Sequence, residues 1–162
     1  MNDELMTDRL AAGGWELPVR QAPLGDYLPG RVVGDLLFLS GQTPQRDGLP
    51  TVTGLVGREL GIDEAREAAA LAALNALAIA REILGGLDRV RSVVRLTGYV
   101  AAVEGFGEHP RVIDGASEVL RTAFGDAGRH ARSAVGVASL PQSSPVEIDL
   151  VLEVAPAHQA VQ

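Results

Sequence analysis

The chain has 162 residues, of which 46% are hydrophobic and 22% are charged, and its formal net charge at pH 7 is −7. This composition is typical of an ordinary globular domain and indicates neither a disordered nor a membrane-embedded chain. The acidic charge and scarce aromatic residues argue against a nucleic-acid partner, and the absence of cysteine excludes disulfides, so we expect a cytoplasmic protein without a membrane partner.

The first part of the chain predicts a short helix, a loop and a buried strand. Residues 1–14 have the apolar spacing of a short helix that a glycine pair ends, and residues 15–31 are rich in Pro and Gly. Residues 36–40, "LLFLS", form an apolar run that Gly41 and Pro44 interrupt. This run indicates a buried strand that leads into a loop.

The rest of the chain predicts two helices and three strands. Residues 61–86 predict a long helix, because Asp63 can cap its start and a glycine pair ends it; its alanine-rich middle is typical of a packing face. A strand at 88–103 and a shorter helix at 109–125 follow. Two further strands, at 132–140 and 146–155, are separated by the turn "PQSSP".

This order of elements predicts an α/β (α+β) fold in which two helices cover one face of a mixed sheet. In the last strand, five aliphatic residues from Val146 to Val154 alternate with residues that point to the second face. The second face also carries Thr97 and Tyr99 and is too apolar to be left in water. We therefore expect a homo-oligomer that covers it.

Metal and cofactor motifs are missing from the sequence. His109, His130 and His158 lie on different predicted elements and form no metal-binding spacing. Ser40, His130 and Asp114 offer the residue types of a hydrolase triad, but no GxSxG turn surrounds the serine. No nucleotide-binding glycine motif is present, so we expect neither a metal nor a cofactor.

Arg132 and Glu147 are charged residues at the starts of two strands. A guanidinium at a strand edge suits the bidentate binding of a carboxylate, but an ion pair with Glu147 or another internal acid explains Arg132 equally well. Partial burial would raise the pKa of Glu147 and let it orient or deprotonate a water, although a salt bridge explains this residue too. The residues alone suggest a small anion site and name no reaction.

Two stretches resemble a known family: "YLPGRVVGDLLFLSGQTP" at 27–44 and "RSAVGVASLPQSSPVEIDLVLEVA" at 132–155. They are similar to the YjgF family, also called the Rid or RidA family of imine and enamine deaminases, some of which are known as L-PSP endoribonucleases. The family spacing of 13 residues from Tyr27 to Ser40 and of 15 from Arg132 to Glu147 is kept. We accordingly divide the chain into an N-terminal extension with a short helix (1–22), a single domain (23–156) and a C-terminal tail (157–162).

The resemblance implies a chorismate-mutase-like homotrimer whose sheets form a central barrel, with cofactor-free sites in clefts between subunits. Arg132 would hold the carboxylate of a 2-imino or enamine acid, and Glu147 would position the attacking water. Ser40 and Tyr27 would line the pocket, with Ser40 among the catalytic residues. Backbone groups beside Gly41 and Ala134 would contact the ligand, and the products would be a 2-keto acid and ammonia.

Three positions depart from the family pattern. Asp114 stands where an asparagine is common, and it places a carboxylate where an anionic substrate would approach. Ala134 replaces a frequent cysteine, and His130 is either a residue specific to a divergent branch or, as we favour, a surface residue of a turn.

The alternatives to a deaminase are a specialised biosynthetic enzyme for another imine, enamine or ester, and a non-catalytic trimer that binds a small carboxylate metabolite. The acidic charge and the absence of a paired-histidine arrangement disfavour a ribonuclease.

Overall fold

The computed structural model describes residues 3–20, 23 and 25–156. Its α-helices are α1 (Asp3–Ala12), α2 (Ile62–Leu84) and α3 (His109–Phe124). Its strands are β1 (Gly30–Val33), β2 (Leu36–Gln42), β3 (Gln45–Arg46), β4 (Leu49–Pro50), β5 (Val90–Ala101), β6 (Ala131–Val137) and β7 (Val146–Val154). Short 3₁₀ turns are η1 (Leu87–Arg89), η2 (Gly125–Gly128) and η3 (Pro141–Ser143).

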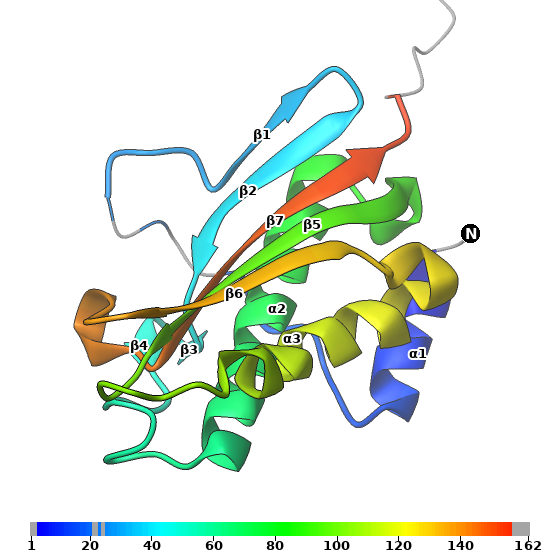
Figure 1. Ribbon diagram of the computed structural model, residues 1–162. Helices are drawn as coiled ribbons and strands as arrows, with labels where there is room; N and C mark the ends of the chain where they lie inside the picture. Colours follow the sequence, from blue (N-terminus) through cyan, green and yellow to red (C-terminus); the bar gives the residue numbers. More distant parts are fainter. Residues whose placement is uncertain (1–2, 21–22, 24, 157–162) are drawn as a thin grey trace, which may run out of the picture.

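Five strands form one mixed sheet in the order β1-β2-β7-β5-β6, and β3 and β4 form a separate small hairpin. Strands β5 and β6 run parallel and are connected through α3, whereas the other pairs in the large sheet are antiparallel. Helices α2 and α3 pack on one face of the sheet (Figure 1). The predicted α+β arrangement is confirmed, but three helices and not two lie on this side, because α1 packs against α3.

The core lies between the helices and the inner face of the sheet. The aliphatic residues of β7 from Val146 to Val154 are buried, as their alternation predicts. Small residues let the layers approach closely: a side chain at Gly98 would collide with Ile113, and one at Gly115 would collide with the backbone of Arg66. The alanine-rich face of α2 is buried for the same reason.

Several predictions about local structure need correction. The N-cap of α2 is Gly61 and not Asp63, and the carboxylate of Glu64 accepts a 2.9 Å hydrogen bond from the Gly61 N–H. Gly85 ends the helix in the left-handed conformation, as predicted. The strands β1, β3 and β4 were not predicted, because they have two to four residues each and lie among Pro and Gly. The predicted tail at 157–162 lies outside the described residues.

The second face of the sheet is partly apolar and is not covered by the helices. Thr97 and Tyr99 lie on it, as predicted, and Tyr99 donates a 3.0 Å hydrogen bond to Asp149. Phe38 of β2 and Val135 of β6 are 45% and 44% exposed on the same face. In the part of the chain that the structure describes, no helix has the length and apolar character needed to cross a membrane.

Candidate active site

Arg132 and Glu147 project from opposite faces of the sheet. Arg132 pairs in register with Leu96 of β5, which points into the core, and its guanidinium reaches α3. Glu147 pairs with Tyr99 on the face away from the helices. The sequence-predicted residues therefore divide into two groups on different surfaces of one chain.

The first group, which we call the glutamate cluster, consists of Ser40, Gly41 and Glu147. The carboxylate of Glu147 lies directly over Gly41, so a side chain at position 41 would collide with Oε1. This approach occurs where the pairing of β2 with β7 is interrupted by a register shift between Leu39 and Gln42. A glycine is required there by space, and the irregular strand end gives Glu147 room beside the main chain.

Glu147 is half-buried, and among the described residues no hydrogen bond to its carboxylate is formed. Burial, with a further contribution from the negative charge of Asp149, raises the pKa of Glu147 above its ordinary value. A carboxylate with an elevated pKa and free lone pairs is suited to accept a proton from water near neutral pH.

The loop that carries Tyr27 is hydrogen-bonded to this cluster through Ser40. The Ser40 hydroxyl donates a 2.6 Å hydrogen bond to the carbonyl of Leu28, and the backbone N–H of Ser40 donates to the carbonyl of Pro29. The side chain of Tyr27 is 48% exposed. The structure thus brings the predicted residues Ser40, Gly41 and Glu147 together, with Tyr27 on the adjoining loop.

The second group surrounds Arg132 at the junction of β6 and α3. Its Nη1 donates hydrogen bonds to Oδ1 of Asp114 at 2.8 Å and to the hydroxyl of Ser117 at 3.0 Å. Its Nη2 donates to the carbonyl of Pro110 at 3.3 Å. The acid that pairs with Arg132 is therefore Asp114 and not Glu147. Ala134 lies on the same side of β6, two residues further along, and packs against the core.

His130 belongs to this second group. Its Nδ1 lies 2.7 Å from the carbonyl of Gly128, so this nitrogen carries a proton and donates it there. Its Nε2 lies 3.0 Å from the hydroxyl of Ser117 and, when the ring is neutral, accepts a hydrogen bond from this hydroxyl. Burial and the nearby charges of Arg132 and Arg121 lower the pKa of His130, against a smaller opposing effect of the Gly128 hydrogen bond. We expected His130 to be a surface residue of a turn. Its ring is instead half-buried and hydrogen-bonded to Gly128 and Ser117.

These residues line a cavity with a volume of about 600 Å³, which we call the arginine cavity. Its walls are formed by four arginines, together with Asp114, Ser117 and His130; the arginines are Arg66, Arg121, Arg129 and Arg132. We did not predict Ser117 and three of the arginines, because they come from separate segments: α2, α3 and the residue that follows η2. The one available signal was the density of cations in "GRHAR".

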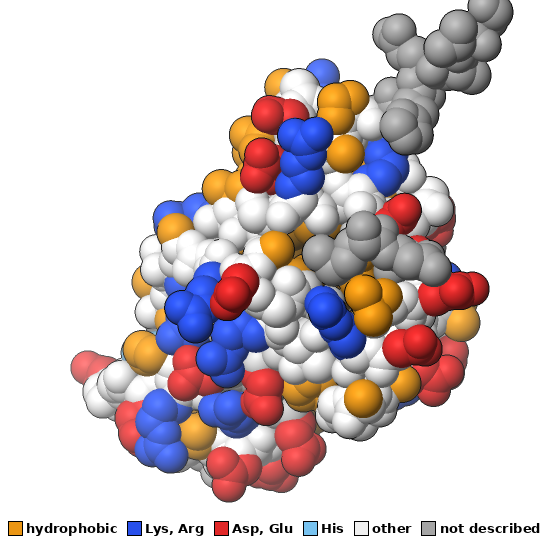
Figure 2. Space-filling view, turned by 90° about the vertical axis from the view of Figure 1, so that its right-hand side faces the viewer, with side chains coloured by type: hydrophobic (Ala, Val, Ile, Leu, Met, Phe, Trp, Pro, Cys, Tyr) orange, Lys and Arg blue, Asp and Glu red, His pale blue; other side chains and the backbone are white. Residues whose placement is uncertain are grey.

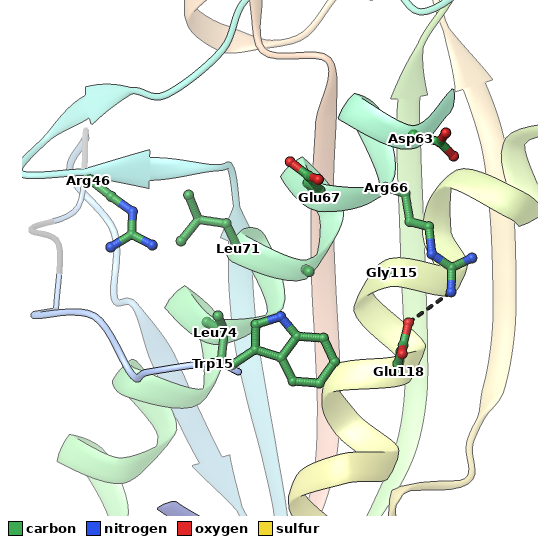
Figure 3. A pocket seen from close by; sticks show the side chains of 10 residues that line it. Trp15, Arg46, Asp63, Arg66, Glu67, Leu71, Leu74, Gly115 and Glu118 are labelled. Atoms are coloured by element: carbon green, nitrogen blue, oxygen red, sulfur yellow. Dashed lines mark hydrogen bonds and ion pairs between the residues drawn. The ribbon is translucent and has the colours of Figure 1, made fainter. Parts of the chain in front are cut away.

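A second cavity, of about 570 Å³, lies on the outer side of the helices (Figure 3). Trp15 and Leu71 form part of its apolar wall, and the 2.8 Å ion pair between Arg66 and Glu118 borders it. This cavity contains none of the predicted site residues. It is an open depression between the N-terminal segment and the two long helices, and it shares only Arg66 with the arginine cavity.

Within the described ranges, no three His, Cys, Asp or Glu side chains are grouped so that they would hold a metal ion.

Comparison with known proteins gives one consistent result. Residues 7–154 match the model of a family described as "YjgF/chorismate mutase-like, putative endoribonuclease". Protein TCP17 of Trypanosoma cruzi is 40% identical over 141 residues, which make up 86% of this chain and 88% of that protein.

Two crystal structures agree in fold over nearly the whole chain. The protein Atu1372 from Agrobacterium tumefaciens is 44% identical, with a TM-score of 0.89, and the match covers 94% of each chain. A protein of Shewanella oneidensis with the same endoribonuclease description is 36% identical, with a TM-score of 0.88, over 95% of this chain and 100% of that chain.

Proposed function

The chain belongs to the YjgF/chorismate mutase-like family, and we propose that it is a cofactor-independent hydrolytic deaminase of small 2-imino and enamine acids. The substrate reacts with water to give a 2-keto acid and ammonia. The observation that carries this proposal is Glu147, a half-buried carboxylate with a raised pKa that lies over Gly41.

The chemistry asks little of the protein, because an imine carbon is already electrophilic. Glu147 accepts a proton from water as the water oxygen bonds to the C=N carbon, and this proton then passes from Glu147 to the imine nitrogen to give a carbinolamine. The hydroxyl proton of the carbinolamine is transferred to its amino nitrogen as the C–N bond breaks, so that the C=O bond forms and ammonia leaves. Positioning of the water and of the substrate carboxylate provides most of the rate enhancement.

In this proposal Arg132 binds the substrate carboxylate. Its Nη1 donates to Asp114 and Ser117, whereas its Nε donates to no acceptor among the described residues. A guanidinium with a free N–H group can still bind a carboxylate by charge-assisted hydrogen bonds.

Arg132 and Glu147 face opposite sides of the sheet, so one chain does not bring both to the same substrate. We propose that each site combines Arg132 of one subunit with Glu147 of the next in a homotrimer whose sheets form a central barrel. The partly apolar face with Phe38 and Val135 supports this arrangement, because assembly would remove it from water.

A coupled assay tests the reaction. An amino acid oxidase generates 2-imino acids, and release of the 2-keto acid is followed with and without the protein. We expect the wild type to accelerate release, Arg132→Ala to lose most of this acceleration, and Arg91→Ala, an exposed arginine on β5, to retain it. If the wild type matches the spontaneous rate for every imine, the deaminase proposal fails in favour of a non-catalytic metabolite-binding trimer.

The endoribonuclease description of the family is the second candidate. The net charge of −7 opposes it, because a polyanionic substrate would be repelled. Incubation with single-stranded RNA under the same conditions tests it directly, and cleavage that Glu147→Gln abolishes would favour it over the deaminase.

A further inference from the structure

We propose that the arginine cavity selects substrates with two acidic groups, so that the preferred substrates are 2-imino dicarboxylic acids. This inference rests on the deaminase proposal and names its substrate class. One acidic group would bind Arg132 beside the reacting carbon, and the second would bind Arg121 and Arg129, which line the same cavity.

Nearby carboxylates largely neutralise the charge of Arg132 and Arg66. Asp114 lies 2.8 Å from Arg132 and 3.9 Å from Arg66, and Glu118 lies 2.8 Å from Arg66. The positive charge of these two arginines is therefore largely balanced by internal carboxylates. They can still donate hydrogen bonds, but they do not by themselves create a strong attraction for a multiply charged ligand.

The charge of Arg121 and Arg129 is less well balanced. Arg121 makes no side-chain hydrogen bond or ion pair within the described part of the chain, yet it lies close enough to His130 to lower the pKa of that ring. The one recorded partner of Arg129 is Asp126, at 3.5 Å, and these two side chains are 79% and 100% exposed, so solvent screens the pair. Positive charge therefore remains on these two arginines of the cavity lining.

This excess of positive charge stands out because the protein as a whole is acidic. On the side of the molecule that carries α1, arginines and carboxylates are mixed over the surface (Figure 2). The arginine cavity, by contrast, is lined by four arginines and one aspartate, and positive charge still exceeds negative charge when the two paired carboxylates outside its lining, Glu118 and Asp126, are included. A local field of this sign attracts anions to the cavity in spite of the overall charge.

Hydrogen bonds within the protein hold Ser117 and His130 in place. The neutral ring of His130 donates from Nδ1 to Gly128 and accepts the Ser117 proton at Nε2, while Arg132 donates to the same hydroxyl. Both side chains are thus engaged with the protein. A second acidic group on the ligand has the guanidinium groups as its partners, and a volume of about 600 Å³ leaves room for a chain longer than that of a three-carbon acid.

A binding experiment tests this inference without relying on turnover. The 2-keto acid products serve as probes: 2-oxoglutarate carries two carboxylates and pyruvate carries one. Titration calorimetry is expected to show binding of 2-oxoglutarate tighter by about tenfold or more, as one additional charged hydrogen-bonding group implies. Arg121→Gln and Arg129→Gln are each expected to weaken 2-oxoglutarate binding by about tenfold and to change pyruvate binding by less than about twofold.

Arg91→Gln is the matched control, since it removes the same charge from an exposed position on β5 outside the cavity. Equal affinity for the two keto acids, or an equal effect of all three substitutions on 2-oxoglutarate, would overturn the inference.

Turnover separates failure of the inference from failure of the proposed function. If the imines of alanine and leucine are hydrolysed as well as those of aspartate and glutamate, the deaminase proposal stands and dicarboxylate selection is wrong. If no imine is hydrolysed but 2-oxoglutarate still binds selectively through Arg121 and Arg129, the deaminase proposal fails while the cavity retains its specificity for two acidic groups.

Discussion

Arg132 and Glu147 lie on neighbouring parts of the same sheet but point to its opposite faces, Arg132 towards α3 and Glu147 away from the helices. They are 15 positions apart in the sequence, on two strands that both flank β5. A reaction that needs both side chains at one substrate therefore needs two copies of the chain.

Mixing of two inactive variants tests this requirement. Arg132→Ala and Glu147→Gln are expected to be inactive alone. After subunit exchange of an equal mixture, about a quarter of the sites in a homotrimer would combine an intact Arg132 with an intact Glu147. Recovery of about a quarter of the wild-type rate is expected, and no recovery after demonstrated subunit exchange would mean that a single chain provides the site.

Glu147→Gln is expected to lower activity and to raise stability at neutral pH. Loss of the proton acceptor should reduce kcat by about a hundredfold or more. The pKa of Glu147 is higher in the folded chain than its ordinary value of 4.5, so the wild type loses stability as pH rises from that value through the folded pKa. Glutamine removes this loss, so urea unfolding at pH 7 should show that Glu147→Gln is more stable than the wild type, by a small amount because solvent partly screens the half-exposed carboxylate.

The same unfolding measurement at pH 4 provides the internal control. At that pH the Glu147 carboxyl group is largely protonated in both the folded and the unfolded wild type. Wild type and Glu147→Gln should therefore have nearly equal stability. A gain of the same size at both pH values would show that the effect is unrelated to ionisation of Glu147.

Gly41→Ala is expected to displace the Glu147 carboxylate, because the new methyl group would occupy the position of Oε1. A shift of about 1 Å in a catalytic group costs on the order of a hundredfold in rate. Gly107→Ala is the matched control, since nothing lies within 4 Å of a Cβ at that position. Wild-type kcat in Gly41→Ala would show that Glu147 does not act from the observed position.

Asp114→Asn is expected to strengthen binding of monocarboxylic substrates. The substitution removes the charge that Arg132 contacts at 2.8 Å, and KM should fall by about three- to tenfold with little change in kcat. Because the side chains of this pair are 23% and 45% exposed, the cost in stability should stay below about 1 kcal/mol. Asp8→Asn on α1 serves as the control for overall charge, and a higher KM in Asp114→Asn alone would show that Asp114 orients Arg132 productively.

His130→Asn is expected to flatten the pH dependence of stability on the acidic side. The pKa of His130 is lower in the folded chain than its ordinary value of 6.5, so the unfolded chain binds the proton more readily. Stability contributed by the neutral ring is complete above pH 6.5 and is lost as pH falls from there through the folded pKa. Thermal unfolding between pH 7 and pH 5 measures this, and identical slopes for the variant and the wild type would contradict it.

The sequence predicted the layers of the fold because long periodic segments carry most of the buried surface. The alternation in β7 and the glycine-terminated α2 are examples in which local pattern and tertiary packing agree. The cap at Gly61 was missed because a glycine offers no side chain, and the capping contact comes instead from Glu64 within the first turn.

The site was only partly predictable for a different reason. Residues near one another in sequence, such as Arg129, His130 and Arg132, were recognisable as a charged group. The contribution of Arg66 depends on how α2 packs against α3, which sequence spacing does not specify. The separation of Arg132 from Glu147 onto opposite faces follows from strand register, and register is set by pairings across distant segments.

Strand β6 lies at the edge of the sheet and pairs only with β5. An unpaired strand edge is a template for unwanted pairing between chains, and charged side chains along it are a common protection against aggregation. Arg129 lies just before this edge in each copy and its side chain is 79% exposed, so like charges would face each other if two free edges met. A variant that lacks this arginine would then have both an altered ligand preference and a greater tendency to precipitate.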